Sequence, residues 1–231
     1  MMLTRVEDFV AEEKRAVLWD MDGTLLRTTE QHRLAWRDTM AAEGFELTEE
    51  RFAESFGRRD ADALRGYLGP RLAACEIERI CADKDGRYLE LIRTAGVRLL
   101  PGVEEWLMRL KSQGWRQAIA SSATRRVIET VLAALGITSY FDLIVSAEDI
   151  ERGKPDPQIF LVAASRLGVQ PSRCVVVEDA PTGIEAARRA GISTLGVLTT
   201  HSTLPAADLS VLTLDCLTPD AFNRLLGTGG K

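Results

Sequence analysis

Two aspartates stand two positions apart in the segment WDMDGT, at Asp20 and Asp22, directly after a short apolar run. In extended chain, residues i and i+2 point the same way, so both carboxylates project together beyond the end of a strand. One carboxylate can attack an electrophile while the other transfers a proton. Because two acids this close repel each other, a cation such as Mg²⁺ is expected beside them. The pair therefore predicts metal-assisted nucleophilic chemistry.

A calcium-binding loop also contains Asp-x-Asp-Gly, so this kind of site is an alternative for the same residues. Counted from Asp20, the sixth loop position is Leu25 where such loops need glycine, and the twelfth is Gln31 where they need glutamate. The spacing therefore excludes a calcium loop. An acidic turn without a chemical role stays open for the pair taken alone.

Three later segments carry groups that suit a bound phosphoryl group or its metal. Ser121 and Ser122 offer hydroxyls and free amides at the start of an expected helix, although a serine there can also be a simple cap. Lys154 lies in a proline-rich loop and can neutralise charge on a transferring phosphoryl group, although a lone lysine is usually exposed. Glu178 and Asp179 follow another apolar run, where they suit a magnesium site or, alternatively, cap the next helix.

The elements that must position these groups follow the pattern of an α/β protein, in which short apolar runs alternate with amphipathic segments. Strands are expected at 16–19, 116–120, 143–145, 174–177 and 194–198. The candidate residues fall at or just beyond the carboxyl ends of these strands, which is where open parallel sheets bind ligands.

Residues from about Thr28 to Arg98 interrupt this alternation with segments that read as helical throughout. The simplest interpretation is a helical domain inserted after the first strand. The core is then discontinuous, at 1–27 and 99–231, and the insertion is a cap domain at 28–98. Helices in the cap are expected near 30–43, 48–55, 60–68 and 71–94.

Composition excludes several classes of protein. The 231 residues carry a formal charge of −5 and no basic block, so the footprint of a nucleic-acid binder is missing. No apolar stretch approaches the roughly 20 residues of a membrane span, and the N-terminal residues are too charged for a signal peptide. The four cysteines have no metal-ligand spacing. A cytoplasmic protein with reduced thiols, a monomer or weak dimer, is expected.

The chain resembles the haloacid dehalogenase superfamily, in its phosphatase and β-phosphoglucomutase branch with a helical cap, through the ordered segments DMDGTLL, ASSAT, GKPDP and VVVEDAPTGIEAARRAG. The resemblance implies a Rossmann-like, doubly wound parallel sheet with an inserted all-helical cap. It implies that Asp20 is the nucleophile that becomes an aspartyl phosphate and that Asp22 transfers protons. Ser121 and Lys154 would orient and neutralise the phosphoryl group.

The same resemblance implies a magnesium site. Its ligands would be Asp20, the backbone carbonyl of Asp22 and Asp179. Glu178 would contribute directly or through a water.

The cap of the resembling branch implies a set of substrate contacts. These are His32, Arg58 or Arg59, and Lys84, with Ser122 from the core. Alternatively, His32 is an interface histidine and the arginines are a solvated surface. Arg27 departs from the branch, whose members usually carry an acid or a small polar residue at this crossing. His201 has no assigned role.

The function expected from these residues is a phosphatase for a small phosphorylated metabolite such as a sugar phosphate. A β-phosphoglucomutase-like mutase would use the same residues and return the phosphoryl group to the sugar. A 2-haloacid dehalogenase needs neither magnesium nor a second motif aspartate, so Asp22 and Asp179 disfavour it. An inactive metabolite sensor is disfavoured by the complete set of candidate catalytic residues.

Overall fold

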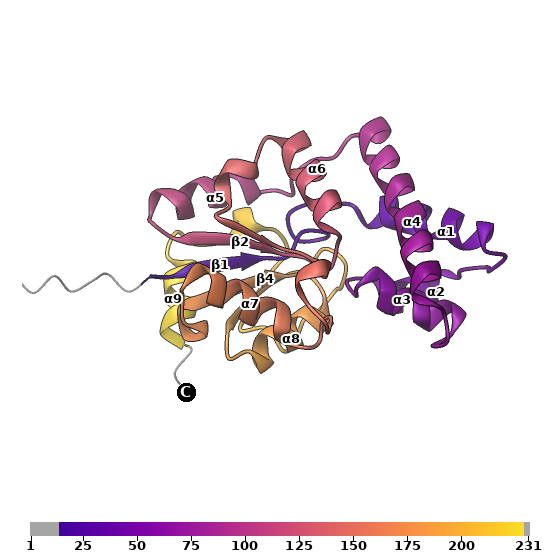
Figure 1. The fold of residues 1–231 in the computed structure, drawn as a ribbon. Helices are drawn as coiled ribbons and strands as arrows, with labels where there is room; N and C mark the ends of the chain where they lie inside the picture. Colours follow the sequence, from indigo (N-terminus) through magenta and orange to yellow (C-terminus); the bar gives the residue numbers. More distant parts are fainter. Residues whose placement is uncertain (1–13, 229–231) are drawn as a thin grey trace, which may run out of the picture.

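The computed structural model describes residues 14–228, which form one sheet covered by helices on both faces and a separate group of helices at its end (Figure 1). The sheet has six strands in the order β3-β2-β1-β4-β5-β6, and every neighbouring pair is parallel. Their bounds are Ala16–Trp19 (β1), Arg116–Ala120 (β2), Leu143–Val145 (β3), Cys174–Glu178 (β4), Ser193–Val197 (β5) and Leu209–Val211 (β6). The expected α/β class with a doubly wound parallel sheet is confirmed.

Alternate residues of the central strand β1 face the two layers of helices, as a pleated strand requires. Val17 and Trp19 pack toward helices α5, α6 and α9, while Ala16 and Leu18 pack toward α7 and α8. These helices are Val103–Ser112 (α5), Arg125–Leu135 (α6), Gln158–Leu167 (α7), Pro181–Arg189 (α8) and Ala221–Thr228 (α9). Because both faces are covered, the strand is apolar throughout.

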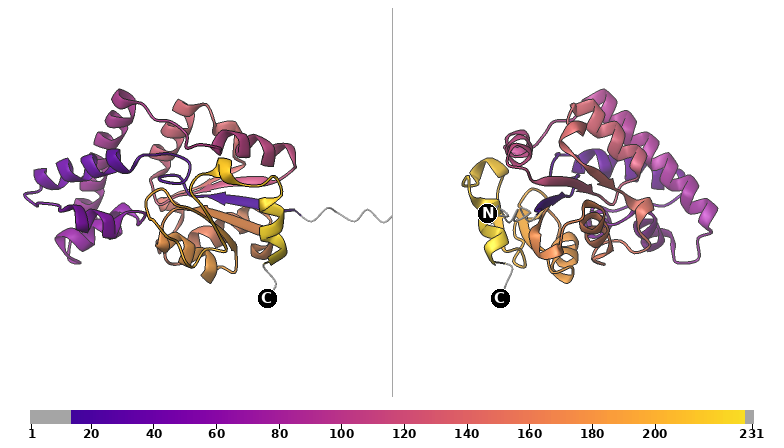
Figure 2. Two further views of the ribbon diagram at one scale, coloured as in Figure 1. Left: turned by 180° about the vertical axis from the view of Figure 1, so that it is seen from behind. Right: turned by 60° about the vertical axis from the view of Figure 1, so that its left-hand side comes forward.

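Four helices form the group beyond the carboxyl ends of the strands, and we call them the cap (Figures 1 and 2). They are Thr29–Ala42 (α1), Glu49–Ser55 (α2), Asp60–Leu68 (α3) and Ala74–Ala95 (α4). The cap has an apolar cluster of its own, which includes Trp36, Met40, Phe52, Leu64 and Ile80. The two chain crossings lie side by side, because Leu26 bridges Leu99 and the Leu100 amide donates to the Leu25 carbonyl.

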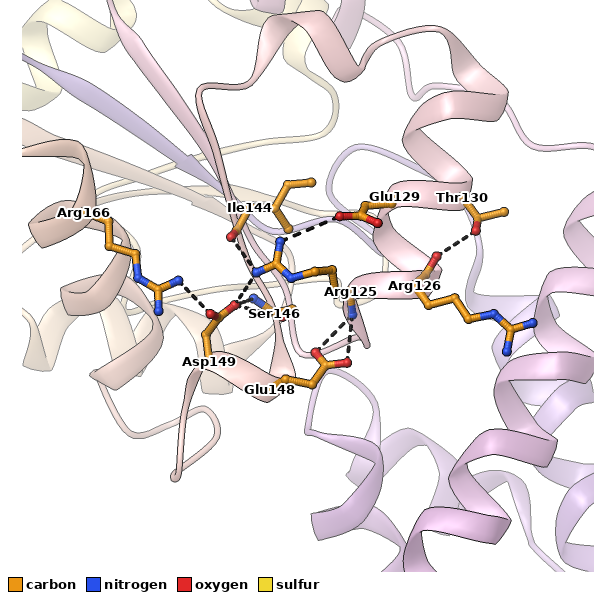
Figure 3. A network of polar contacts seen from close by, with 9 residues as sticks. All are labelled: Arg125, Arg126, Glu129, Thr130, Ile144, Ser146, Glu148, Asp149 and Arg166. Atoms are coloured by element: carbon orange, nitrogen blue, oxygen red, sulfur yellow. Dashed lines mark hydrogen bonds and ion pairs between the residues drawn. The ribbon is translucent and has the colours of Figure 1, made fainter.

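A network of polar contacts fixes the start of α6, and with it the loop that follows β2 (Figure 3). The Arg125 amide donates to the Glu148 carboxylate at 3.1 and 3.0 Å. The Arg125 guanidinium donates to Asp149 at 2.7 Å and to the Ile144 carbonyl at 3.2 Å, and Asp149 also accepts from Arg166 at 2.7 Å. The network therefore ties α6 to β3, to the short 3₁₀ turn Ala147–Asp149 and to α7.

None of the helices within residues 14–228 combines the length and the apolar composition needed to cross a membrane.

Candidate active site

The parallel strands bring the candidate residues to one edge of the sheet. Trp19 is in register with Val177 on β4 and with Ile119 on β2, so the residues that follow these strands lie together. The Asp20 amide donates to the Val177 carbonyl at 3.0 Å, which continues the ladder into the site.

Lys154 reaches this edge from the loop before α7, and its side chain is 1% exposed. Its Nζ lies 2.6 Å from Asp20 Oδ1 and 2.8 Å from Glu178 Oε1. Burial lowers the pKa of Lys154, but Asp20 and Glu178 together raise it above its ordinary value. The lysine is therefore a fixed cation in contact with the proposed nucleophile.

Three carboxylates, those of Asp20, Glu178 and Asp179, have ligand atoms within 4.8 Å of one another. Burial and the neighbouring acids raise the pKa of Asp20 to about 7, against the opposing effect of Lys154. The pKa of Asp179 is also raised, by burial first and then by the other two acids. The three carboxylates carry more negative charge than one lysine can balance. Such a set of oxygen ligands fits a hard divalent cation such as Mg²⁺.

Glycines leave the space in which two of these acids lie. A Cβ on Gly23, whose φ is 87°, would lie 2.0 Å from Asp179 Oδ2. A Cβ on Gly183 would lie 1.7 Å from Glu178 Oε1. Because glycine has no side chain, the carboxylates of Asp179 and Glu178 can lie directly against the backbone at Gly23 and Gly183.

Glu178 is held more completely than the other acids. Its Oε2 accepts hydrogen bonds from the amides of Asp179 and Ala180 at 2.8 and 2.7 Å, and its Oε1 accepts from Lys154. Asp179 accepts instead from the hydroxyls of Thr24 at 3.2 Å and Thr200 at 2.5 Å. Glu178 is thus arranged to hold Lys154, and its contact with a metal stays a prediction.

Asp22 is bound by residues that come from the crossing and the cap. Its Oδ1 accepts from Thr28 Oγ1 at 2.6 Å and from the Tyr88 hydroxyl at 3.0 Å. His32 Nε2 also lies 3.0 Å from this oxygen, but without hydrogen-bond geometry, and its ring stacks on Tyr88 at 4.1 Å. Burial raises the pKa of Asp22, but His32, Thr28 and Tyr88 lower it to about 2.

A cavity that is partly open to solvent lies between this edge and the cap. Asp20, Asp22, Ser121 and Ser122 line it from the core. Its cap wall combines aromatic and charged side chains, namely His32, Trp36, Phe52, Phe56, Arg58, Asp60 and Lys84.

The two serines take different positions. Ser121 is buried, and its hydroxyl accepts a hydrogen bond from the Ala123 amide at 3.2 Å. Ser122 donates to the Gly57 carbonyl at 2.9 Å and so joins the core to the cap.

The two adjacent arginines of the cap separate in space. Arg58 lines the cavity and forms no ion pair within residues 14–228. Arg59 is absent from the cavity lining, and it pairs with Asp62 at 2.8 Å and donates to the Ile150 carbonyl at 3.2 Å. The geometry therefore favours Arg58 as the substrate contact, a choice that the sequence leaves open.

Sequence reasoning missed four polar residues of the site: Thr28, Asp60, Tyr88 and Thr200. A hydroxyl gives no signal of its own in a sequence. Asp60 is the first residue of α3, where an acid is expected simply to favour the helix dipole. His201, to which the sequence analysis gives no role, lies with Nδ1 3.2 Å from the Asp179 carbonyl oxygen.

Comparison with known proteins adds independent findings. A family model described as haloacid dehalogenase-like hydrolase matches residues 14–191. Validoxylamine A 7'-phosphate phosphatase of Streptomyces hygroscopicus subsp. limoneus is 32% identical, over 87% of this chain and 93% of that protein. Fructose-1-phosphate phosphatase of Escherichia coli is 36% identical, over 80% and 97%. The crystal structure of β-phosphoglucomutase from Clostridium difficile superposes with a TM-score of 0.83 at 29% identity, covering 93% of this chain and 97% of that one.

Proposed function

The chain belongs to the haloacid dehalogenase-like hydrolases, and on this premise we propose that it is a magnesium-dependent phosphatase for a small phosphorylated metabolite of the sugar-phosphate class. The family predicted from the sequence is thereby confirmed. One observation carries the proposal: the carboxylate of Asp20 is held by buried Lys154 within a cluster of acids, facing a cavity under the cap. The similarity to two phosphatases of small phosphorylated compounds supports the choice of reaction.

In the proposed first step, an oxygen of Asp20 attacks phosphorus and the bond to the leaving oxygen breaks, which gives an aspartyl phosphate. Asp22 donates a proton to the leaving oxygen. Lys154, 2.6 Å from Asp20, is placed to neutralise negative charge as it develops on the phosphoryl group. A magnesium ion held by Asp20, Asp179 and the backbone carbonyl of Asp22 would add to this charge neutralisation.

In the second step, water attacks phosphorus and Asp22 takes a proton from it, so that phosphate leaves and Asp20 is restored. With a pKa of about 2, Asp22 is an anion in the observed arrangement, which is the form that this second step needs. For the first step it must carry a proton. Separation of Asp22 from His32 and Tyr88 would raise the pKa of Asp22 and so favour its protonated form.

On the cap, the proposed substrate contacts are His32 and Arg58, with Ser122 facing them from the core. Lys84, which the sequence also predicts as a contact, is bound to Asp60 at 2.7 Å. All four residues line the cavity that Asp20 also lines. The cytoplasmic location and the monomeric or weakly dimeric state stay predictions from the sequence.

The direct test is phosphate release from a panel of sugar phosphates and other small monoesters, with Mg²⁺ or with a chelator in its place. We expect release with Mg²⁺ and a loss of at least about a hundredfold in rate without it. A panel without any phosphate release, or a rate that chelation leaves unchanged, would contradict the proposal.

A second candidate, a sugar-phosphate mutase, is favoured by the structural similarity to β-phosphoglucomutase. It would use the same residues but return the phosphoryl group to the sugar through a bisphosphate. Conversion of β-glucose 1-phosphate to glucose 6-phosphate in the presence of a bisphosphate primer, at a rate above that of phosphate release, would establish it.

A further inference from the structure

The charge of Lys84 is already balanced inside the cap. Its side chain is 1% exposed, and Nζ lies 2.7 Å from Asp60 Oδ2 and 3.5 Å from Asp85 Oδ1. The same Nζ lies 5.7 Å from the ring centre of Trp36 and 5.4 Å from that of Tyr88. An ammonium group has three protons. The two carboxylates and the two aromatic rings therefore surround the N–H groups of Lys84, which are then not available to bind a substrate.

Asp60 binds this lysine at the wall of the cavity, which both residues line. Its side chain is 17% exposed and lines the same cavity as Asp20, at the first residue of α3. A carboxylate only accepts hydrogen bonds, so Asp60 offers an acceptor to hydroxyl groups of a leaving group. The same charge repels a second phosphate.

On the cap side of the cavity, only the charge of Arg58 is without an ion pair within residues 14–228. Lys84 also lines the cavity, but it is paired with Asp60, which lines the cavity too, and with Asp85, which does not. The rest of this wall is largely aromatic, from Trp36, Phe52 and Phe56. A wall of this kind suits an uncharged ring or chain that carries hydroxyls. A phosphate dianion there would meet Asp60, with Arg58 as the one unpaired cation of this wall to offset the repulsion.

We infer that Asp60 is a specificity-determining residue, which selects monophosphate esters with an uncharged, hydroxyl-bearing leaving group and rejects sugar bisphosphates. The inference rests on the proposed phosphatase function and names its substrate class. It assigns Lys84 the role of holding Asp60, whereas the sequence predicts that Lys84 contacts the substrate itself.

The test compares two matched pairs of compounds in the presence of Mg²⁺: fructose 1-phosphate with fructose 1,6-bisphosphate, and glucose 6-phosphate with glucose 1,6-bisphosphate. For the better pair, we expect kcat/KM of the wild-type protein to be at least about tenfold higher for the monophosphate, because like charges in a partly buried site repel strongly. Equal or higher kcat/KM for the bisphosphate would overturn the inference. This comparison needs no variant.

Asp60→Asn removes the charge and keeps the size of the side chain. We expect this variant to reduce the ratio of kcat/KM for monophosphate over bisphosphate to about threefold or less, mainly because kcat/KM for the bisphosphate rises. Glu78→Gln is the matched control, because Glu78 is exposed on α4 and lies outside this cavity. A folded Asp60→Asn protein with the wild-type preference would refute the role of Asp60. If this variant does not fold, the wild-type comparison still decides the substrate class.

The two proposals fail in different ways. No phosphate release from these four compounds or from the wider panel would contradict the phosphatase function itself. Phosphate release without discrimination between monophosphate and bisphosphate would contradict only the substrate class.

Discussion

Neighbouring acids in the site have opposite environments, although Asp20 and Asp22 are only two positions apart. Burial among other carboxylates raises the pKa of Asp20, whereas His32 of the cap, together with the hydroxyls of Thr28 and Tyr88, lowers the pKa of Asp22. The raised pKa of Asp20 is expected, because Lys154 alone does not balance the negative charge around it. This unbalanced charge is the reason to expect a metal ion. The lowered pKa links Asp22, the proposed proton-transfer group, to the cap.

Gly183 provides a residue-scale test of how tightly Glu178 is placed. A Cβ at this position would lie 1.7 Å from Glu178 Oε1, so Gly183→Ala must displace the carboxylate that holds Lys154. We expect kcat for phosphate release to fall at least about tenfold, because a small misplacement of a positioned group costs rate.

Gly86→Ala is the matched control, because Gly86 lies within α4 and has no atom within 4 Å of an added Cβ. We expect it to keep the wild-type rate and to gain about 0.5–1 kcal/mol in stability. Circular dichroism would show that both variants are folded. Wild-type kcat in Gly183→Ala would mean that the position of Glu178 does not matter.

At the scale of elements, the sequence predicts best where one force dominates. The strands 16–19, 116–120 and 143–145 are predicted with their observed bounds. The first and third are continuous apolar runs, and the second ends in one. β6, at Leu209–Val211, was missed because Ser210 interrupts its apolar residues, whereas β3, also an edge strand of three residues, is apolar throughout. α9 was missed with it.

The candidate site follows the same division. The residues at the strand ends could be predicted, because the parallel sheet brings them together whatever the loops do. The cap could be predicted as helices, but its contacts depend on the rotation of each helix. Asp60, Tyr88 and Arg58 obtain their places from that packing, and single-sequence periodicity does not determine it.

The polar network at the start of α6 predicts a pH dependence of stability (Figure 3). Burial raises the pKa of Asp149, but hydrogen bonds from Ser146 and Arg166 lower it from 3.8 to about 2. A folded-state pKa below the unfolded value adds stability above pH 4 or so, and this stability is lost as pH falls toward about 2.

We therefore expect Asp149→Asn to destabilise the protein by about 1 to 2 kcal/mol at pH 6 and by much less at pH 2. Thermal melts of both proteins across this range measure the difference. Asp38→Asn, in an exposed ion pair of α1, serves as the control with little effect at any pH. A difference of the same size at pH 2 and pH 6 would show that Asp149 does not act through its charge.

At the scale of the whole molecule, hydrogen bonds join the cap to the core around the cavity. Ser122 donates to the Gly57 carbonyl, Thr124 donates to Asp85 at 2.7 Å, and Arg59 donates to the Ile150 carbonyl. Tyr88 adds the contact with Asp22. These contacts hold the cap wall over Asp20, so the closed arrangement depends on several weak bonds that can be removed one at a time.

Thr124→Val removes the bond to Asp85 and keeps the shape of the side chain. We expect KM to rise about threefold to tenfold with a smaller change in kcat, because apparent affinity falls with the closed fraction of the protein. Thr130→Val is the control, since Thr130 is exposed on α6, the helix that Thr124 precedes, and its hydroxyl donates to the Arg126 carbonyl. An unchanged KM in Thr124→Val would show that this bond does not contribute to closure.

The most direct test of the central claim is the rate of phosphate release by Asp20→Asn, measured with Mg²⁺ on the best substrate of the panel. The substitution keeps the size of the side chain and removes the nucleophilic carboxylate. We expect a loss of at least about a thousandfold in kcat with the fold retained. Phosphate release by a folded Asp20→Asn protein at the wild-type rate would show that Asp20 is not the nucleophile.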